Sequence, residues 1–134
     1  MDNQLIIPYL EELDLEASEE NISLLLAKWD GVRPELETLY RNRDQQSTLQ
    51  LMKKGIVYFI QFLYCSNDRQ VNSKEPIPLN HLEIKPVNLE ERLTYILSRP
   101  SLFHSYRQLS ELFTEQEKLF AKKNIVKKRL SQNG

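Results

Sequence analysis

Residues 56–65 read IVYFIQFLYC, a run in which nine of ten side chains are apolar and Gln61 is the exception. Just upstream, Ser47 and Gln50 match the S-x-x-Q capping box, in which two side chains pair with backbone donors at the start of a helix. The run is also β-branched and aromatic, so a buried strand is the competing interpretation. We favour a helix because the capping box precedes it and no second strand is visible to pair with it. A helix that is apolar on nearly all sides belongs at the centre of a bundle.

Shorter helical patterns lie upstream of this run. Ser18 is a suitable N-cap, and residues 22–29 carry apolar side chains at spacings of three and four, which predicts an amphipathic helix. Gly31 interrupts the pattern, and Pro34 suits the first position of a new helical turn. We therefore expect residues 34–43 to form a second short helix or a kinked continuation of the first.

Two further helices follow a long connection over residues 66–87. Three prolines in this connection exclude a long helix, yet its apolar residues predict a segment packed on the bundle rather than a disordered linker. The expected anchors are Ile77, Leu79, Leu82, Ile84 and Val87. Asn88 opens a capping-box-like start to a short helix that Pro100 ends, and the last helix is expected from near Ser101 to about Leu130.

These elements predict an all-α protein, a single-domain bundle of four to five helices with a long proline-containing connector. A chain of 134 residues suits one domain. We divide it into an acidic N-terminal arm (residues 1–17), a helical bundle domain (residues 18–130) and a C-terminal tail (residues 131–134).

The composition excludes several kinds of site. With three glycines in the chain, no glycine-rich loop is present to surround a phosphate. One cysteine and two histidines cannot supply an ordinary four-ligand zinc site, and the lone Cys65 cannot form an internal disulfide. We expect no metal and no cofactor. No signal peptide is readable, and the apolar run is shorter than the roughly 20 residues that span a bilayer, so we expect a cytoplasmic protein without membrane insertion.

The 18 basic and 19 acidic residues are unevenly distributed. Residues 1–20 carry seven acidic and no basic side chains, whereas residues 118–134 carry six basic and no acidic ones. A basic helix end can bind nucleic-acid phosphates, and the candidate contacts are Lys122, Lys123, Lys127, Lys128 and Arg129. We favour a solvated helix end or a partner-docking surface, because cations are stabilising at a helix C-terminus. The acidic arm can also neutralise this end within the molecule, and its apolar residues 5–10 indicate docking on the bundle or on another protein.

Catalytic candidates are weak. His81 has no second histidine nearby, His104 suits a contact with a helix terminus or an aromatic ring, and Cys65 ends an apolar helix. Paired carboxylates such as those of Glu90 and Glu91 are typical of a helix first turn. We interpret all of these as structural.

Several phrases of the second half of the chain resemble the YpoC-like family of small uncharacterised proteins from Gram-positive bacilli. They are PVNLEERL (86–93), RP (99–100), FHSY (103–106), QL (108–109) and KLFAK (118–122), with FLYCSN (62–67) upstream. The resemblance implies a helical, cytoplasmic bacterial protein, and it implies no particular activity.

Within these phrases, polar and aromatic side chains gather at the start of the last helix, where backbone amides are unpaired and can hold anions or carboxylates. The candidate interaction residues are Arg99, His104, Ser105, Tyr106 and Gln108. The alternative is that they fix the angle between the last two helices.

The sequence therefore predicts a non-catalytic protein-interaction or accessory module, whose partner is another protein bound at this surface, the connector and the arm. The alternative is a nucleic-acid-binding accessory protein that uses the basic C-terminal helix. A third hypothesis is a hydrolase or transferase with a site at His104, Ser105 and Tyr106.

Overall fold

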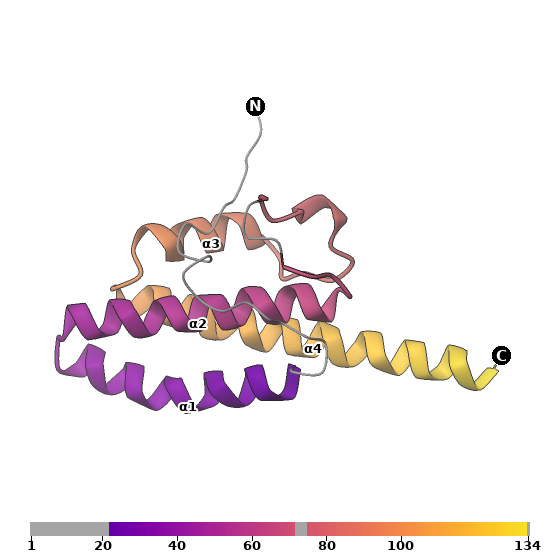
Figure 1. Ribbon diagram of the computed structural model, residues 1–134, viewed down its shortest axis with the longest axis horizontal. Coiled ribbons are helices and arrows are strands. Elements are labelled where there is room, and N and C mark those ends of the chain that lie inside the picture. Colours follow the sequence, from indigo (N-terminus) through magenta and orange to yellow (C-terminus); the bar gives the residue numbers. More distant parts are fainter. Residues whose placement is uncertain (1–21, 72–74, 134) are drawn as a thin grey trace.

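The computed structural model describes residues 22–71 and 75–133, the last three as backbone only. Its helices are α1 (Ile22–Arg41), α2 (Gln45–Ser66), α3 (Leu89–Ser98) and α4 (Phe103–Asn133), with a 3-10 turn, η3 (Leu79–His81), in the connector (Figure 1). These residues contain no strand, so the all-α prediction is confirmed and the strand alternative for residues 56–65 is wrong. The N-terminal arm and Ser18 lie outside the described residues.

Helix α1 is continuous through Gly31 and Pro34 to Arg41, so residues 34–41 continue the first helix, as one of the two alternatives predicted, and a separate second helix over residues 34–43 is wrong. The reason is tertiary. One face of α1 is buried on both sides of Gly31 and Pro34, through Leu25, Trp29 and Leu36. Burial of this face holds the helical register. Pro34 and Asp30 are exposed, so the Asp30 carbonyl group that proline leaves without its usual amide partner can meet water.

Helix α2 is the centre of the bundle, as predicted, and every residue from Phe59 to Ser66 is buried. Its start was predicted two residues too late. The N-cap is Asp44, whose Oδ1 accepts a hydrogen bond from the Ser47 backbone amide at 3.1 Å. Ser47 and Asp44 are both good N-cap residues, and the tight turn after α1, in which Arg43 has a φ of 56°, selects Asp44.

Three helices meet around Trp29 of α1. Its indole stacks on Phe113 of α4 with ring centroids 4.5 Å apart and an interplanar angle of 10°. Gly55 of α2 lies against the same indole, where a side chain would not fit. Phe59 and Phe62 extend the aromatic contacts of Phe113 into the core. Close packing at this point fixes α1, α2 and α4 relative to one another.

The connector is packed on the bundle where the structure describes it, and Ile77 and Leu82 are buried. Val87 was expected to anchor it but is 72% exposed, because Pro86 occupies the buried position beside it. Asn67 holds the connector in place. Its Nδ2 donates to the carbonyl oxygens of Leu63 and Ile84, and its Oδ1 accepts from the Ile84 amide at 2.8 Å.

Helix α3 begins after Asn88, as predicted, but Asn88 makes no side-chain capping bond and has a φ of 56°. Helix α4 starts two residues later than expected, at Phe103, and continues past Leu130 to Asn133, so residues 131–133 of the predicted tail are helical.

The end of α4 projects beyond the bundle (Figure 1). Helices α1 and α4 are antiparallel, and the Trp29–Phe113 stack sets their register. Ile22, the first described residue of α1, lies seven residues before Trp29 and is therefore level with Phe120, seven residues after Phe113. Residues 121–133, here called the α4 overhang, extend about 20 Å beyond the start of α1 at about 1.5 Å per residue, although Lys123 near their start still contacts the end of α2 and the connector.

Candidate functional site

The loop between α3 and α4 is held by its own hydrogen bonds. Arg99 is the C-cap of α3, and its amide donates to the Tyr95 carbonyl oxygen. The Arg99 carbonyl oxygen accepts from the Ser105 hydroxyl at 2.6 Å and from the Leu102 amide at 3.2 Å. Ser105 is fully buried, so its hydroxyl serves this turn and faces no solvent.

Two other candidate residues also join α4 to α3. His104 is exposed, and its ring meets Tyr95 edge-on with centroids 5.3 Å apart. The Gln108 Oε1 accepts from Arg92 Nε at 3.0 Å. Ser105, His104 and Gln108 thus each contact α3 or its C-cap, the arrangement expected if they set the angle between the two helices.

Tyr106 faces the opposite way, toward α1. Its hydroxyl donates to Glu37 Oε2 at 2.5 Å, and the ring is 4% exposed. Burial raises the pKa of Tyr106, the bond to Glu37 raises it further, and a hydrogen bond with Arg33 lowers it. The five candidate residues therefore do not converge on one open site.

A different set of side chains is exposed at this end of the bundle. Leu102 is 42% and Phe103 50% exposed. The Phe103 ring meets Tyr40 edge-on, with centroids 5.5 Å apart, and the Tyr40 hydroxyl donates to the Pro100 carbonyl oxygen at 3.0 Å. Phe103 is thus held on a rigid base with half of its surface open to solvent.

Beside Phe103 lies a groove of about 450 Å³ between α1 and α4. Its lining combines charged and aromatic side chains: Arg33, Glu37, Phe103, Tyr106, Arg107, Ser110 and Glu111. We call this groove, together with the exposed residues Arg99, Leu102 and His104, the corner surface.

The sequence analysis did not select Phe103, Arg107 or Arg33 as candidates. Leu102 lies before the first residue of α4 and Phe103 begins that helix, so both are at its exposed end. Arg33 belongs to α1, which is far from α4 in the sequence, so no local sequence pattern predicts that it lines this groove.

Arg92 was also missed, and it is the main polar link between α3 and α4. It binds Glu115 through two hydrogen bonds, at 3.0 and 2.6 Å, and donates to the Val87 carbonyl oxygen at 3.0 Å. Such a bidentate pair has a fixed geometry, so Arg92 positions α3 on α4.

The connector lies at the other end of α3 from the corner surface. With the start of α3 it lines a groove of about 550 Å³, which includes Leu79, Lys85 and the exposed Val87. The interaction surface predicted over both regions is therefore divided between two ends of the bundle.

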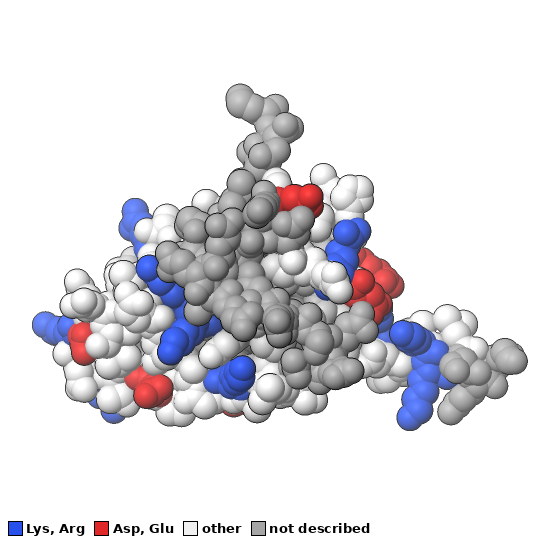
Figure 2. Space-filling view, viewed as in Figure 1, with Lys and Arg blue, Asp and Glu red and all other residues white. Residues whose placement is uncertain are grey.

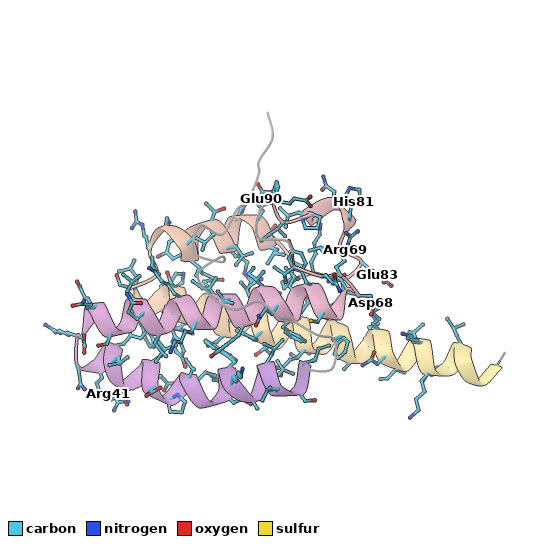
Figure 3. All side chains as sticks on the ribbon, viewed as in Figure 1. Arg41, Asp68, Arg69, His81, Glu83 and Glu90 are labelled. Carbon is cyan, nitrogen blue, oxygen red and sulfur yellow. The ribbon has the colours of Figure 1, made fainter. Side chains whose placement is uncertain are left out.

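Of the basic residues near the C-terminus, Lys123 has a structural role. Its Nζ donates to the Ser66 carbonyl oxygen at 3.0 Å and forms ion pairs with Asp68 and Glu83 at 3.1 and 3.3 Å. Figure 3 shows Asp68 and Glu83 close together near the end of α2. Burial lowers the pKa of Lys123, but the bonds to Asp68 and Glu83 raise it by more. Lys123 therefore ties α4 to the end of α2 and to the connector.

The other four basic candidates, Lys122, Lys127, Lys128 and Arg129, are exposed on the α4 overhang. Among the described residues none of these four forms an ion pair. Figure 2 shows basic side chains along the projecting end of α4.

The remaining chemical candidates lie apart. His81 is exposed in η3, where its carbonyl oxygen accepts from Arg69, and Cys65 is buried in α2. Within residues 22–71 and 75–133, no group of three or more His, Cys, Asp or Glu side chains is arranged to hold a metal ion. None of the helices described is both long enough and apolar enough to cross a membrane.

The described residues form a small all-α bundle. Its candidate functional features are exposed surfaces, namely the corner surface and the α4 overhang. Residues 19–128 match the YpoC-like protein family, and the chain belongs to this family. It is 32% identical over 113 residues to the uncharacterized protein YpoC of Bacillus subtilis (strain 168), an alignment that covers 83% of this chain and 69% of that protein. No solved structure matches the chain.

Proposed function

We propose that the protein is a non-catalytic interaction module of the bacterial cytoplasm that binds a partner protein through the corner surface. The observation that carries this proposal is the half-exposed Phe103 ring, held by Tyr40 beside the α1–α4 groove. Rigid aromatic side chains and arginines are the residues that most often dominate protein interfaces.

The charges beside Phe103 suit a protein ligand. Arg107 and Arg33 line the groove together with Glu37 and Glu111, so both signs are available to orient a bound segment. Tyr106 organises the inner wall, because Arg33 and Glu37 both interact with its hydroxyl. A wall fixed in advance reduces the entropy lost on binding.

The test uses a photo-crosslinking amino acid at position 103 of the full chain, expressed in its own bacterium. The matched control carries the same amino acid at Leu24 of α1, a large apolar residue that is also 50% exposed. We expect one discrete protein adduct at position 103, none at position 24, and loss of the adduct when Arg107→Glu is added. Absence of an adduct at position 103, or the same adduct at position 24, contradicts the proposal.

The non-catalytic part has its own test. The side chains of this group contact Tyr95, the Arg99 carbonyl oxygen and Glu37 within the fold, so any activity found for the purified protein should survive His104→Ala. A specific activity that this substitution abolishes, while the variant keeps its unfolding temperature, contradicts that part.

A further inference from the structure

The α4 overhang carries apolar side chains that the bundle does not cover. Ile125, Val126 and Leu130 are 54%, 49% and 69% exposed. At the base of the overhang, Val126 and Leu130 continue a groove of about 470 Å³ that starts at Leu119 and Ile84. The overhang continues the formed helix α4, but most helical stability in proteins comes from packing of an apolar face, so a covering partner would stabilise the overhang.

The charge of the overhang restricts what can cover it. Lys122, Lys127, Lys128 and Arg129 surround the apolar residues, and the acidic Asp68 and Glu83 at its base are already paired with Lys123. The overhang of a second copy would bring like charges together, which is unfavourable. A segment that is acidic and also carries apolar residues would therefore complement the overhang.

The chain itself contains such a segment. Residues 5–20 include six acidic side chains and no basic one, together with the apolar run LIIPYL at residues 5–10. We propose that residues 5–20 bind along the α4 overhang of the same molecule, with their acidic side chains beside its lysines and their apolar ones against Val126 and Leu130. This proposal concerns another surface than the corner surface and stands independently of it.

The point of attachment makes this contact favourable. Residue 20 lies two positions before Ile22, which is level with Phe120 at the base of the overhang. A segment of 16 residues reaches up to about 50 Å when extended, well beyond the roughly 20 Å of the overhang. A short tether also gives an effective concentration in the millimolar range, so a weak contact is sufficient.

A consequence is that the basic end of α4 is neutralised by its own chain. The contact is largely electrostatic between exposed groups, so it weakens as salt screens the charges. A nucleic acid or an acidic partner would have to displace the N-terminal segment to reach Lys127 and Lys128.

The experiment measures paramagnetic broadening of backbone amide signals in the full chain. A nitroxide is attached to Glu12→Cys, and the native Cys65, which is 3% exposed, stays unlabelled. We expect the amides of residues 125–130 to lose most of their intensity, and Lys127→Gln combined with Lys128→Gln to restore most of it. The matched control, Arg41→Gln with Lys54→Gln, removes the same charge from two exposed positions on α1 and α2 and should leave the broadening unchanged.

Four results would overturn the proposal. The first two are absence of broadening at residues 125–130 and broadening that persists in the Lys127→Gln, Lys128→Gln variant. The third is broadening in a mixture in which the label and the isotope are on different molecules, which would assign the site to a second copy. The fourth is a salt-sensitive shift of these amides by an oligonucleotide that leaves the nitroxide broadening in place, which would assign the surface to nucleic acid.

Discussion

Gly55 of α2 lies directly against the indole of Trp29, so that a Cβ atom at position 55 would be 2.7 Å from Cζ3 of the ring. The ring cannot move away easily, because it also stacks on Phe113 and packs beside Tyr106. The glycine is therefore required by the packing of α1 on α2, although it sits inside a helix where glycine is intrinsically unfavourable.

We predict that Gly55→Ala lowers the free energy of unfolding by about 1–3 kcal/mol, because the added methyl overpacks the Trp29 site. Gly31→Ala is the matched change, since nothing lies within 4 Å of its added Cβ and the helix gains a better former. It should raise the free energy of unfolding by about 0.5–1 kcal/mol. Urea unfolding of both variants checks the pair, and equal effects of the two substitutions would show that the Trp29 contact does not decide the outcome.

The second prediction concerns the connector. Asn67→Asp keeps the size of the side chain but removes the Nδ2 donor, leaving the carbonyl oxygens of Leu63 and Ile84 facing a carboxylate. We expect the free energy of unfolding to fall by about 2–4 kcal/mol, because a buried carboxylate would face two carbonyl oxygens, even though Ser66 Oγ and Gln116 Nε2 still donate to them. The exchange rate of backbone amide hydrogens should rise most at residues 82–85 and little in α1, whereas uniform acceleration over the bundle would argue against a local clamp.

The third prediction tests Lys123. Lys123→Met preserves the apolar stem and removes the ammonium group that binds Ser66, Asp68 and Glu83. We expect the free energy of unfolding to fall by about 1–3 kcal/mol, because hydrogen bonds to charged groups are stronger than those between neutral groups. Lys127→Met, a neighbouring exposed position, is the control and should change thermal stability little. A similar effect of both substitutions would mean that the overhang charge, and not the tie to α2, matters.

The fourth prediction concerns alkaline pH. Burial raises the pKa of Tyr40, Tyr64 and Tyr106 above the ordinary phenol value of 10.0. In the folded protein these hydroxyls stay protonated where the unfolded chain ionises. The stability linked to the protonated form is therefore complete below about pH 10 and is lost as pH rises toward the folded pKa.

Stability measured at increasing pH above 10 should fall in the native protein and fall less steeply in Tyr40→Phe. The stability of Tyr106→Phe should also fall less steeply with pH than that of the native protein. This variant starts from a lower stability because it loses the hydrogen bond to Glu37. An identical pH slope in the native protein and Tyr40→Phe would contradict the assignment of the effect to this buried phenol.

Local sequence patterns predicted most of the helical architecture. The apolar run at residues 56–65 predicted the central helix, and Asn88 and Pro100 marked both ends of α3. Such signals are local, because helical periodicity and capping involve neighbours within one or two turns. The places where they failed are those where two local signals compete, as at Gly31 and Pro34, and burial of the α1 face decided between them.

The candidate site was less accessible from sequence. Ser105, Tyr106 and Gln108 were recognised as unusual at the start of α4, but their partners are Arg99, Glu37 and Arg92. Two of these partners lie 16 and 69 residues away. A polar residue near a helix start looks the same in sequence whether it faces solvent or is buried, and the arrangement of the helices makes the difference.

The sequence by itself determined that this chain forms helices, where α3 begins and ends, and how its charge is divided between the two termini. These properties depend on residue type and short spacing. The tertiary structure decided which polar side chains are buried, that Lys123 belongs to the fold while its basic neighbours are exposed, and that Phe103 faces solvent beside a groove. Those outcomes depend on which helices pack together, because the environment of a side chain is set by residues distant in the sequence.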